Sequence, residues 1–358
     1  MTDIFTMLSS LTGGLSASGF ERSAHEAMKA AISPYFDDCE TLPGGGLIFT
    51  RRCPRDGAPT VMLDTHLDEI GLMVSDVTDE GMLRVEALGG VDLRTLPASD
   101  VTVYGRGGSF PGVIAAVPPH LTKASDRDRL PDIRSLLIDT GYDRETMLRL
   151  APAGTPIGYV SRMRKLLDGR VAGRGFDDKA CAAIVLRAME YLDEHAPDER
   201  LGWNVAYSLA SGEETGETGA APGARAVMPD AAIILDVGFG TAPDVSKGSG
   251  KLGGGPVISL SAASDRYLTN ALIAFAEEKK IPYRAIVEAA GTGTDGDVVN
   301  TTLCGIPAAV VSLPLLNMHT QSEIIDMSDI ETIGDLIGAF IAEGGLGSWY
   351  AGAKEAKL

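Results

Sequence analysis

Two adjacent carboxylates, Glu213 and Glu214, follow the apolar run of residues 203–210 and open a turn that contains glycine. Neighbouring residues that leave a strand point in opposite directions, so one carboxylate could bind a metal ion while the other faces a substrate. On its own, an acidic pair beside glycines is more often a solvated loop end. The pair belongs to a site only if other segments place ligand-type side chains in the same way.

Ligand-type residues also follow strand-like apolar runs in four other segments. In an open α/β sheet, ligands bind outside the carboxyl ends of the strands, so residues from distant segments meet at that edge. The residues concerned are His66, Asp177 with Asp178, Asp236 and His319. We therefore predict that they converge with the glutamate pair.

The residue types indicate a metal centre. Histidine nitrogen and carboxylate oxygen are the usual ligands of catalytic zinc and of related divalent cations, whereas structural zinc is more often held by cysteine. Two cations could be held if one carboxylate bridges them, and their residual positive charge would acidify a bound water and polarise a carbonyl group. The candidate ligands are His66, Asp177, Glu214, Asp236 and His319.

Two further acids have candidate catalytic roles. Glu213 would remain free as a general base, and Asp68, two residues after His66, is placed to accept the second ring N–H of that histidine. Any one histidine could instead be a satisfied core residue, and any one aspartate could cap a helix. The joint pattern is much harder to explain as coincidence. We expect the other three histidines to lie outside the site: His25, His120 and His195.

The elements that must position these residues predict an α/β fold. After about residue 172, helical and strand patterns alternate, which is typical of a mainly parallel sheet flanked by helices. The capping-box pattern that begins at Ser18 predicts a helix to about Pro34. Between residues 73 and 164, short strand-like runs alternate with Gly, Pro and Asp clusters, which predicts an inserted, barrel-like all-β domain. The catalytic domain would then comprise residues 1–72 and 165–358.

Composition narrows the function classes. The chain has 358 residues and a net charge of -18, which argues against a nucleic-acid or anionic-membrane partner. No apolar run is long enough for a membrane span, and the acidic N-terminus is unlike a secretory signal, so we expect a cytoplasmic protein. Four dispersed cysteines suggest neither a thiolate zinc site nor a disulfide framework. They are Cys39, Cys53, Cys181 and Cys304.

At this level of detail the chain resembles the TET-type dinuclear metallo-aminopeptidases, a family that includes glutamyl, leucyl and lysyl aminopeptidases and has often been mislabelled as endoglucanases. The resemblance runs through most of the chain. Its main motifs are residues 65–71, 173–179, 213–216, 235–237 and 318–323.

The resemblance implies a ligand arrangement. Asp177 would bridge two divalent ions, with zinc favoured and cobalt or manganese also accepted. His66 and Asp236 would complete one ion site, and Glu214 and His319 the other. A hydroxide between the two ions would attack the peptide bond.

The resemblance also implies roles around the metals. Glu213 would take a proton from the bridging water and pass it to the leaving amine, Asp178 would support the bridging carboxylate, and Asp68 would orient His66. The substrates would be short peptides. Subunits would assemble through the insert into a hollow tetrahedral dodecamer, which gives the insert a role in oligomerisation and access.

The chain departs from the family pattern beside the predicted site. Gly212 stands where glutamine is usual, Lys179 and Thr218 stand where arginine is common, and residues 315–318 lack an Arg-Tyr pair. All five predicted ligands and the base are kept. These departures therefore bear on substrate preference more than on the chemistry.

Two other functions fit parts of the pattern. Glu213 and Asp178 could be the paired carboxylates of a glycoside hydrolase, but that mechanism has no use for the two histidines. The chain could also be a scaffold or metal-binding subunit that has lost turnover, although the retained Glu213 argues against it. The preferred N-terminal side chain stays open: Asp295 would favour a basic one if it points into the pocket, or would hold a loop if it does not.

Overall fold

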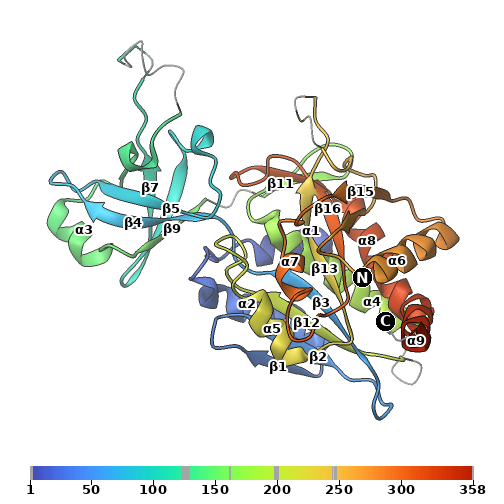
Figure 1. The fold of residues 1–358 in the computed structure, drawn as a ribbon. Coiled ribbons are helices and arrows are strands. Elements are labelled where there is room, and N and C mark those ends of the chain that lie inside the picture. Colours follow the sequence, from blue (N-terminus) through green and yellow to red (C-terminus); the bar gives the residue numbers. More distant parts are fainter. Residues whose placement is uncertain are drawn as a thin grey trace.

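The computed structural model describes residues 3–118, 120–121, 130–160, 163–196, 201–243, 245 and 248–356. A large α/β domain carries a small β-barrel that projects from one side of it (Figure 1). None of the described helices is long and apolar enough to cross a membrane. All four cysteines are free.

The α/β domain is built on an eight-stranded sheet with the order β1-β2-β12-β3-β13-β16-β14-β15. The four central strands β12, β3, β13 and β16 are parallel, while β2 and β14 run antiparallel to their central neighbours. The predicted α/β fold with a mainly parallel sheet is confirmed. The strands are β1 (Asp38–Thr41), β2 (Leu47–Arg51), β3 (Thr60–His66), β12 (Asn204–Ala210), β13 (Ala231–Phe239), β14 (Val257–Ser261), β15 (Arg284–Glu288) and β16 (Ala308–Leu315).

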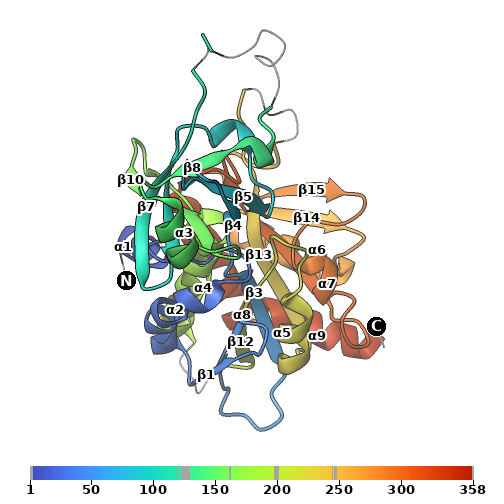
Figure 2. The ribbon, with the colours of Figure 1, turned by 90° about the vertical axis from the view of Figure 1, so that its left-hand side faces the viewer.

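Helices cover both faces of this sheet (Figures 1 and 2). Side chains alternate between the faces along each strand: Leu63 and Ile233 join the core formed with α4 and α8, whereas Met62 and Ile234 join the core under α5 and α7. The helices are α1 (Ile4–Leu11), α2 (His25–Ile32), α4 (Phe176–His195), α5 (Ala220–Val227), α6 (Arg266–Lys279), α7 (Gly296–Val299), α8 (Met327–Ala342) and α9 (Gly345–Ala356), with short 3-10 turns at Glu21–Ala24, Ser33–Tyr35, Leu93–Thr95 and Ile133–Ser135.

The helix expected from Ser18 to Pro34 is shorter than predicted. A 3-10 turn, Glu21–Ala24, precedes α2, which ends at Ile32. The Ser18 hydroxyl lies 2.7 Å from the Thr215 hydroxyl, so it joins two segments instead of capping a helix. This tertiary contact overrides the local capping pattern.

The inserted strands close into an antiparallel barrel with the order β4-β5-β8-β7-β6-β9. The barrel has its own apolar core, which includes Leu72, Val85, Val103 and Ile138. A second small sheet, β10-β11-β17, lies in the α/β domain. The remaining elements are β4 (Gly71–Val77), β5 (Leu83–Leu88), β6 (Asp100–Gly105), β7 (Gly108–Ile114), β8 (Leu137–Asp139), β9 (Pro156–Tyr159), β10 (Arg164–Lys165), β11 (Arg170–Gly173), β17 (Glu323–Asp326) and α3 (Arg144–Leu150).

Candidate metal centre and active site

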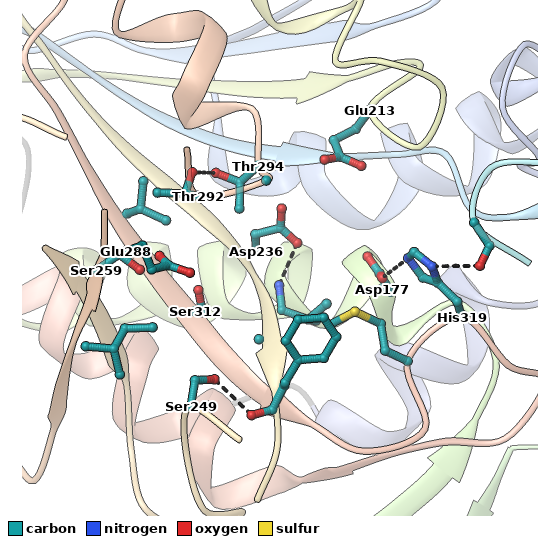
Figure 3. Close-up of a pocket in the computed structure, with 18 of the residues that line it drawn as sticks. Asp177, Glu213, Asp236, Ser249, Ser259, Glu288, Thr292, Thr294, Ser312 and His319 are labelled. Carbon is teal, nitrogen blue, oxygen red and sulfur yellow. Dashed lines mark hydrogen bonds and ion pairs between the residues drawn. The ribbon is translucent and has the colours of Figure 1, made fainter. Parts of the chain in front are cut away.

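The parallel strands bring the predicted site residues to one edge of the sheet. His66 ends β3 and pairs in register with Ala210, the last residue of β12, so the loop that carries the glutamate pair begins beside this histidine. Asp236 lies in β13, Asp177 lies at the start of α4, and His319 follows β16. Figure 3 shows acidic and histidine side chains from these segments around one pocket.

Asp177 lies between two groups of possible ligands. Its Oδ1 is 2.9 Å from His66 Nε2, and its Oδ2 is 3.3 Å from His319 Nε2. Asp236 Oδ1 lies 3.8 Å from His66 Nε2, and Glu214 Oε2 lies 3.3 Å from His319 Nε2. Within each group, the ligand atoms lie within 4.8 Å of one another. A single carboxylate is therefore shared by two clusters.

The electrostatics of these clusters fit divalent cations. Burial raises the pKa of Glu214, and the nearby Asp177 carboxylate adds to this, bringing the pKa to about 8. Burial also raises the pKa of Asp236, and the Asp178 carboxylate raises it further. Glu214 Oε1 is buried and has no hydrogen-bond partner among the described residues. Crowded, desolvated carboxylates with an unused oxygen and two imidazoles are a donor set suited to such cations.

The His66 ring lies against both the backbone carbonyl and the carboxylate of Asp68. The nearer acceptor for its Nδ1–H is the Asp68 backbone carbonyl at 3.0 Å, while the Asp68 carboxylate is 3.6 Å away. That carboxylate also accepts the backbone N–H groups of Glu213 at 3.0 Å and Glu214 at 3.2 Å. Asp68 therefore fixes the turn in which both glutamates lie.

A further positioning residue, Glu323, was not assigned a role from the sequence. Its Oε2 accepts the N–H groups of Phe176 at 2.8 Å and Asp177 at 3.3 Å, and its Oε1 accepts the N–H of His319 at 3.2 Å. Glu323 thus joins the two segments that supply Asp177 and His319. Its place in the motif of residues 318–323 was the only signal available, since Asp177 lies 146 residues away in the chain.

The other acids named from the sequence lie beneath the pocket. Asp178 is fully buried, and its Oδ2 accepts the backbone N–H of His66 at 3.2 Å. Asp295 is 3% exposed and does not line the pocket. Burial raises its pKa, and the facing Asp64 carboxylate raises it further. Asp295 is thus placed to support the fold beneath the site and not to contact an N-terminal side chain.

The three other histidines lie outside the clusters. His25 Nε2 is 2.7 Å from the Gly45 carbonyl, and the His195 ring stacks on Tyr191 with centroids 4.0 Å apart. His120 is exposed in a turn of the barrel domain.

Three of the departures from the family pattern have local structural reasons. Gly212 has a φ of +69°, and a Cβ there would lie 2.4 Å from the Thr218 hydroxyl oxygen. Glycine at 212 therefore suits both the backbone and the neighbouring threonine. The Lys179 ammonium is buried 3.4 Å from the Glu69 carboxylate, which also pairs with Arg174.

Taken together, the fold and the clusters are those of a metal-dependent hydrolase. The chain belongs to the M42 glutamyl aminopeptidase family, which matches residues 45–336. The predicted resemblance is confirmed, and the protein is a metal-dependent aminopeptidase, an enzyme that hydrolyses peptide bonds.

Similar proteins agree with this assignment. The lysyl aminopeptidase of Pyrococcus furiosus is 32% identical over 81% of this chain and 83% of its own length. The structure of a TET aminopeptidase from a marine sediment thaumarchaeon covers 98% of both chains with a TM-score of 0.89 and 26% identity. The TET1 peptidase of Pyrococcus horikoshii, which can assemble into a tetrahedron or a large octahedral shell, is 28% identical with a TM-score of 0.81 over 95% of this chain and 100% of its own.

Proposed function

We propose that this protein removes the N-terminal residue from short peptides with the help of two divalent metal ions and with Glu213 as the general base. The observation that carries this proposal is the position of Asp177, whose two carboxylate oxygens face separate ligand groups.

Each ligand group would hold one cation. His66, Asp177 and Asp236 would bind the first cation. Asp177, Glu214 and His319 would bind the second. When bound, the cations would supply Lewis acidity that lowers the pKa of water and polarises the peptide carbonyl. Zinc suits this donor set best, and cobalt or manganese would also be accepted.

Glu213 would move the proton. Its carboxylate lines the pocket, and its Oε2 lies 3.9 Å from His66 Nε2. Burial raises the pKa of Glu213, which makes this carboxylate a better proton acceptor. Glu213 would accept a proton from the attacking water and deliver it to the amine nitrogen as the C–N bond breaks. The hydrogen bond from Glu213 N–H to Asp68 would keep the base in place.

The glycoside-hydrolase alternative finds no support in this geometry. Asp178 is fully buried and does not line the pocket, so it could not reach a sugar together with Glu213. A scaffold without turnover would keep the same ligands, and only an assay separates it from an active enzyme.

We also propose an assembly and a cellular location for the protein. A homo-oligomer is supported by the assemblies named for the Pyrococcus horikoshii relative and by a similar structure described as a dodecamer. We expect a dodecamer whose contacts involve the barrel. The cytoplasm remains the expected location, with short peptides as the substrates.

The test is a reconstitution assay. Purified protein loaded with zinc, cobalt or manganese should cleave aminoacyl-nitroanilides and should lose this activity to a chelator. Glu213→Gln should lower kcat by roughly 10²- to 10⁴-fold, the usual contribution of a general base. Elemental analysis should show unchanged metal content in this variant. The matched control is Glu278→Gln, at an exposed position of α6, which should keep full activity.

Each alternative predicts a different result. Full activity in Glu213→Gln would contradict the assigned base. Bound metal without any peptide cleavage would favour the scaffold, and chelator-resistant cleavage of a polysaccharide would favour the glycosidase.

A further inference from the structure

The pocket extends well beyond the metal clusters. Its volume is about 1020 Å³, and its floor crosses four strands of the sheet. Ser312 pairs in register with Asp236, Val310 pairs with Ser259, and Ser259 pairs with Ile286. These register pairs place Asp236, Ser312, Ser259 and Ile286 on adjoining strands, so the strands form one continuous wall beside the metal centre. A side chain attached to the reacting peptide could lie on this wall.

Two carboxylates line this extension and take no part in the clusters. Glu217 follows the glutamate pair, and Glu288 ends β15; Figure 3 draws Glu288 between the side chains of Thr292 and Ser312. Both carboxylates are half-buried, and no hydrogen bond or ion pair to either side chain occurs within the described parts of the chain. Both therefore face the pocket without a cationic partner.

The surroundings of Glu217 are strongly negative. Burial raises its pKa to about 7, and the Asp297 and Glu213 carboxylates contribute to that rise. Asp297 is occupied elsewhere, since its carboxylate accepts the N–H groups of Thr292 at 2.8 Å and Gly293 at 3.0 Å. This network fixes the loop that forms the adjoining wall. A cation entering here would meet uncompensated negative charge held by a fixed loop.

One arginine lies at the other end of β15. Among the described lining residues, Arg284 is the only lysine or arginine, and it is exposed. Arg284 and Glu288 lie on the same face of the strand four residues apart, which separates their Cα atoms by about 13 Å. Arg284 therefore leaves the negative charge at the Glu288 end uncompensated.

We propose that the part of the pocket beyond the metal clusters receives the N-terminal side chain of the substrate, an inference that rests on the proposed function. Glu217 and Glu288 would make lysine and arginine the preferred N-terminal residues. Ile286 is partly exposed and offers apolar surface for the methylene stem, and the carboxylates meet the charged end. An acidic side chain would be repelled by the same two groups.

The experiment compares kcat/KM for lysyl-, arginyl-, leucyl- and glutamyl-nitroanilides. The wild type should cleave the basic substrates best and the glutamyl substrate least. Glu217→Gln with Glu288→Gln should lower the lysyl-to-leucyl ratio roughly ten- to a hundredfold, because an interacting charge is removed from a partly buried site. Glu288→Lys should raise the relative rate on the glutamyl substrate. Equal metal content would show that each variant keeps its metal centre.

A control makes the result specific. Glu278→Gln, at an exposed position of α6 outside the pocket, should change no ratio. A wild-type preference for glutamyl substrates, or an unchanged lysyl-to-leucyl ratio in the double variant, would overturn the inference. Failure to cleave any of the four substrates would overturn the proposed function itself, so the two failures can be told apart.

Discussion

The adjacent acids Glu213 and Glu214 have different surroundings although they share one turn. The Glu214 carboxylate lies against His319, whereas Glu213 faces the pocket near His66. Asp68 accepts the N–H groups of both residues, so a single buried carboxylate sets the direction of each. The proposed division between ligand and base is therefore supported by a difference in surroundings that a residue at another strand end sets.

Glu69 illustrates a second buried charge network behind the site. Burial raises the pKa of Glu69, but attraction from Arg174 and then Lys179 outweighs burial and brings the pKa down to about 2. Glu69→Gln would leave both cations buried without a counter-charge. We expect this variant to lose about 3–5 kcal/mol of unfolding free energy at neutral pH.

The same network predicts a pH dependence. A carboxyl whose pKa is lowered by folding contributes stability in full above its unfolded pKa, near 4.5, and this contribution is lost as the pH falls towards 2. Unfolding measured at about pH 5 and about pH 3 should therefore show a larger loss in the wild type than in Glu69→Gln. The exposed Glu278→Gln should follow the wild type, and parallel pH curves for all three proteins would contradict the assignment.

At the scale of elements, α8 packs closely against the middle of α4, the helix whose first turn contains Asp177. Gly334 and Gly338 lie on the face of α8 that meets α4. A Cβ on Gly338 would lie 2.6 Å from Tyr191 Cβ and 2.9 Å from the Ala188 carbonyl oxygen. The two helices can approach this closely only because these positions lack side chains.

Gly338→Ala should therefore destabilise the protein. Alanine favours a helix over glycine by up to about 1 kcal/mol, but overpacking against backbone costs about 1–3 kcal/mol, so the net loss should be about 1–2 kcal/mol. The measurement is denaturant unfolding. Gly352→Ala on α9 is the matched control, because a Cβ there meets nothing within 4 Å, and it should be neutral or stabilising. Equal stabilities for the two variants would show that α4 and α8 can shift apart.

The elements also show what the sequence could predict. Apolar runs such as residues 61–63 indicated buried parallel strands, and the polar residues after them indicated the site edge. The strands β14 and β15 are parallel to each other but run antiparallel to β16 and the other central strands. This direction carries no local signal, because it depends on connections made elsewhere in the chain. For that reason the pocket wall, and Glu288 with it, could not be predicted. Asp295 was a candidate because the resemblance places it near the family's pocket-forming segment, and it is buried outside the pocket lining.

At the scale of the whole molecule, the barrel and the overall charge bear on assembly. Copies of a chain with a net charge of -18 repel one another, so the contacts of an assembly must outweigh this repulsion, as apolar contacts would. The barrel exposes large apolar side chains on its surface, including Val113 at 45%, Tyr142 at 47% and Leu148 at 44%. These side chains are candidates for such contacts.

We therefore expect the protein to elute as a multi-subunit particle, with its mass measured by light scattering. High salt should maintain or increase this mass, because salt screens the repulsion between copies. Introducing charge through Val113→Asp with Leu148→Asp should reduce the mass towards that of one chain while circular dichroism stays unchanged. Leu303→Asp, at a position 52% exposed on the α/β domain, should not. A monomeric wild type at every salt concentration would contradict the proposed assembly, and an intact particle in the double variant would show that the barrel contacts lie elsewhere.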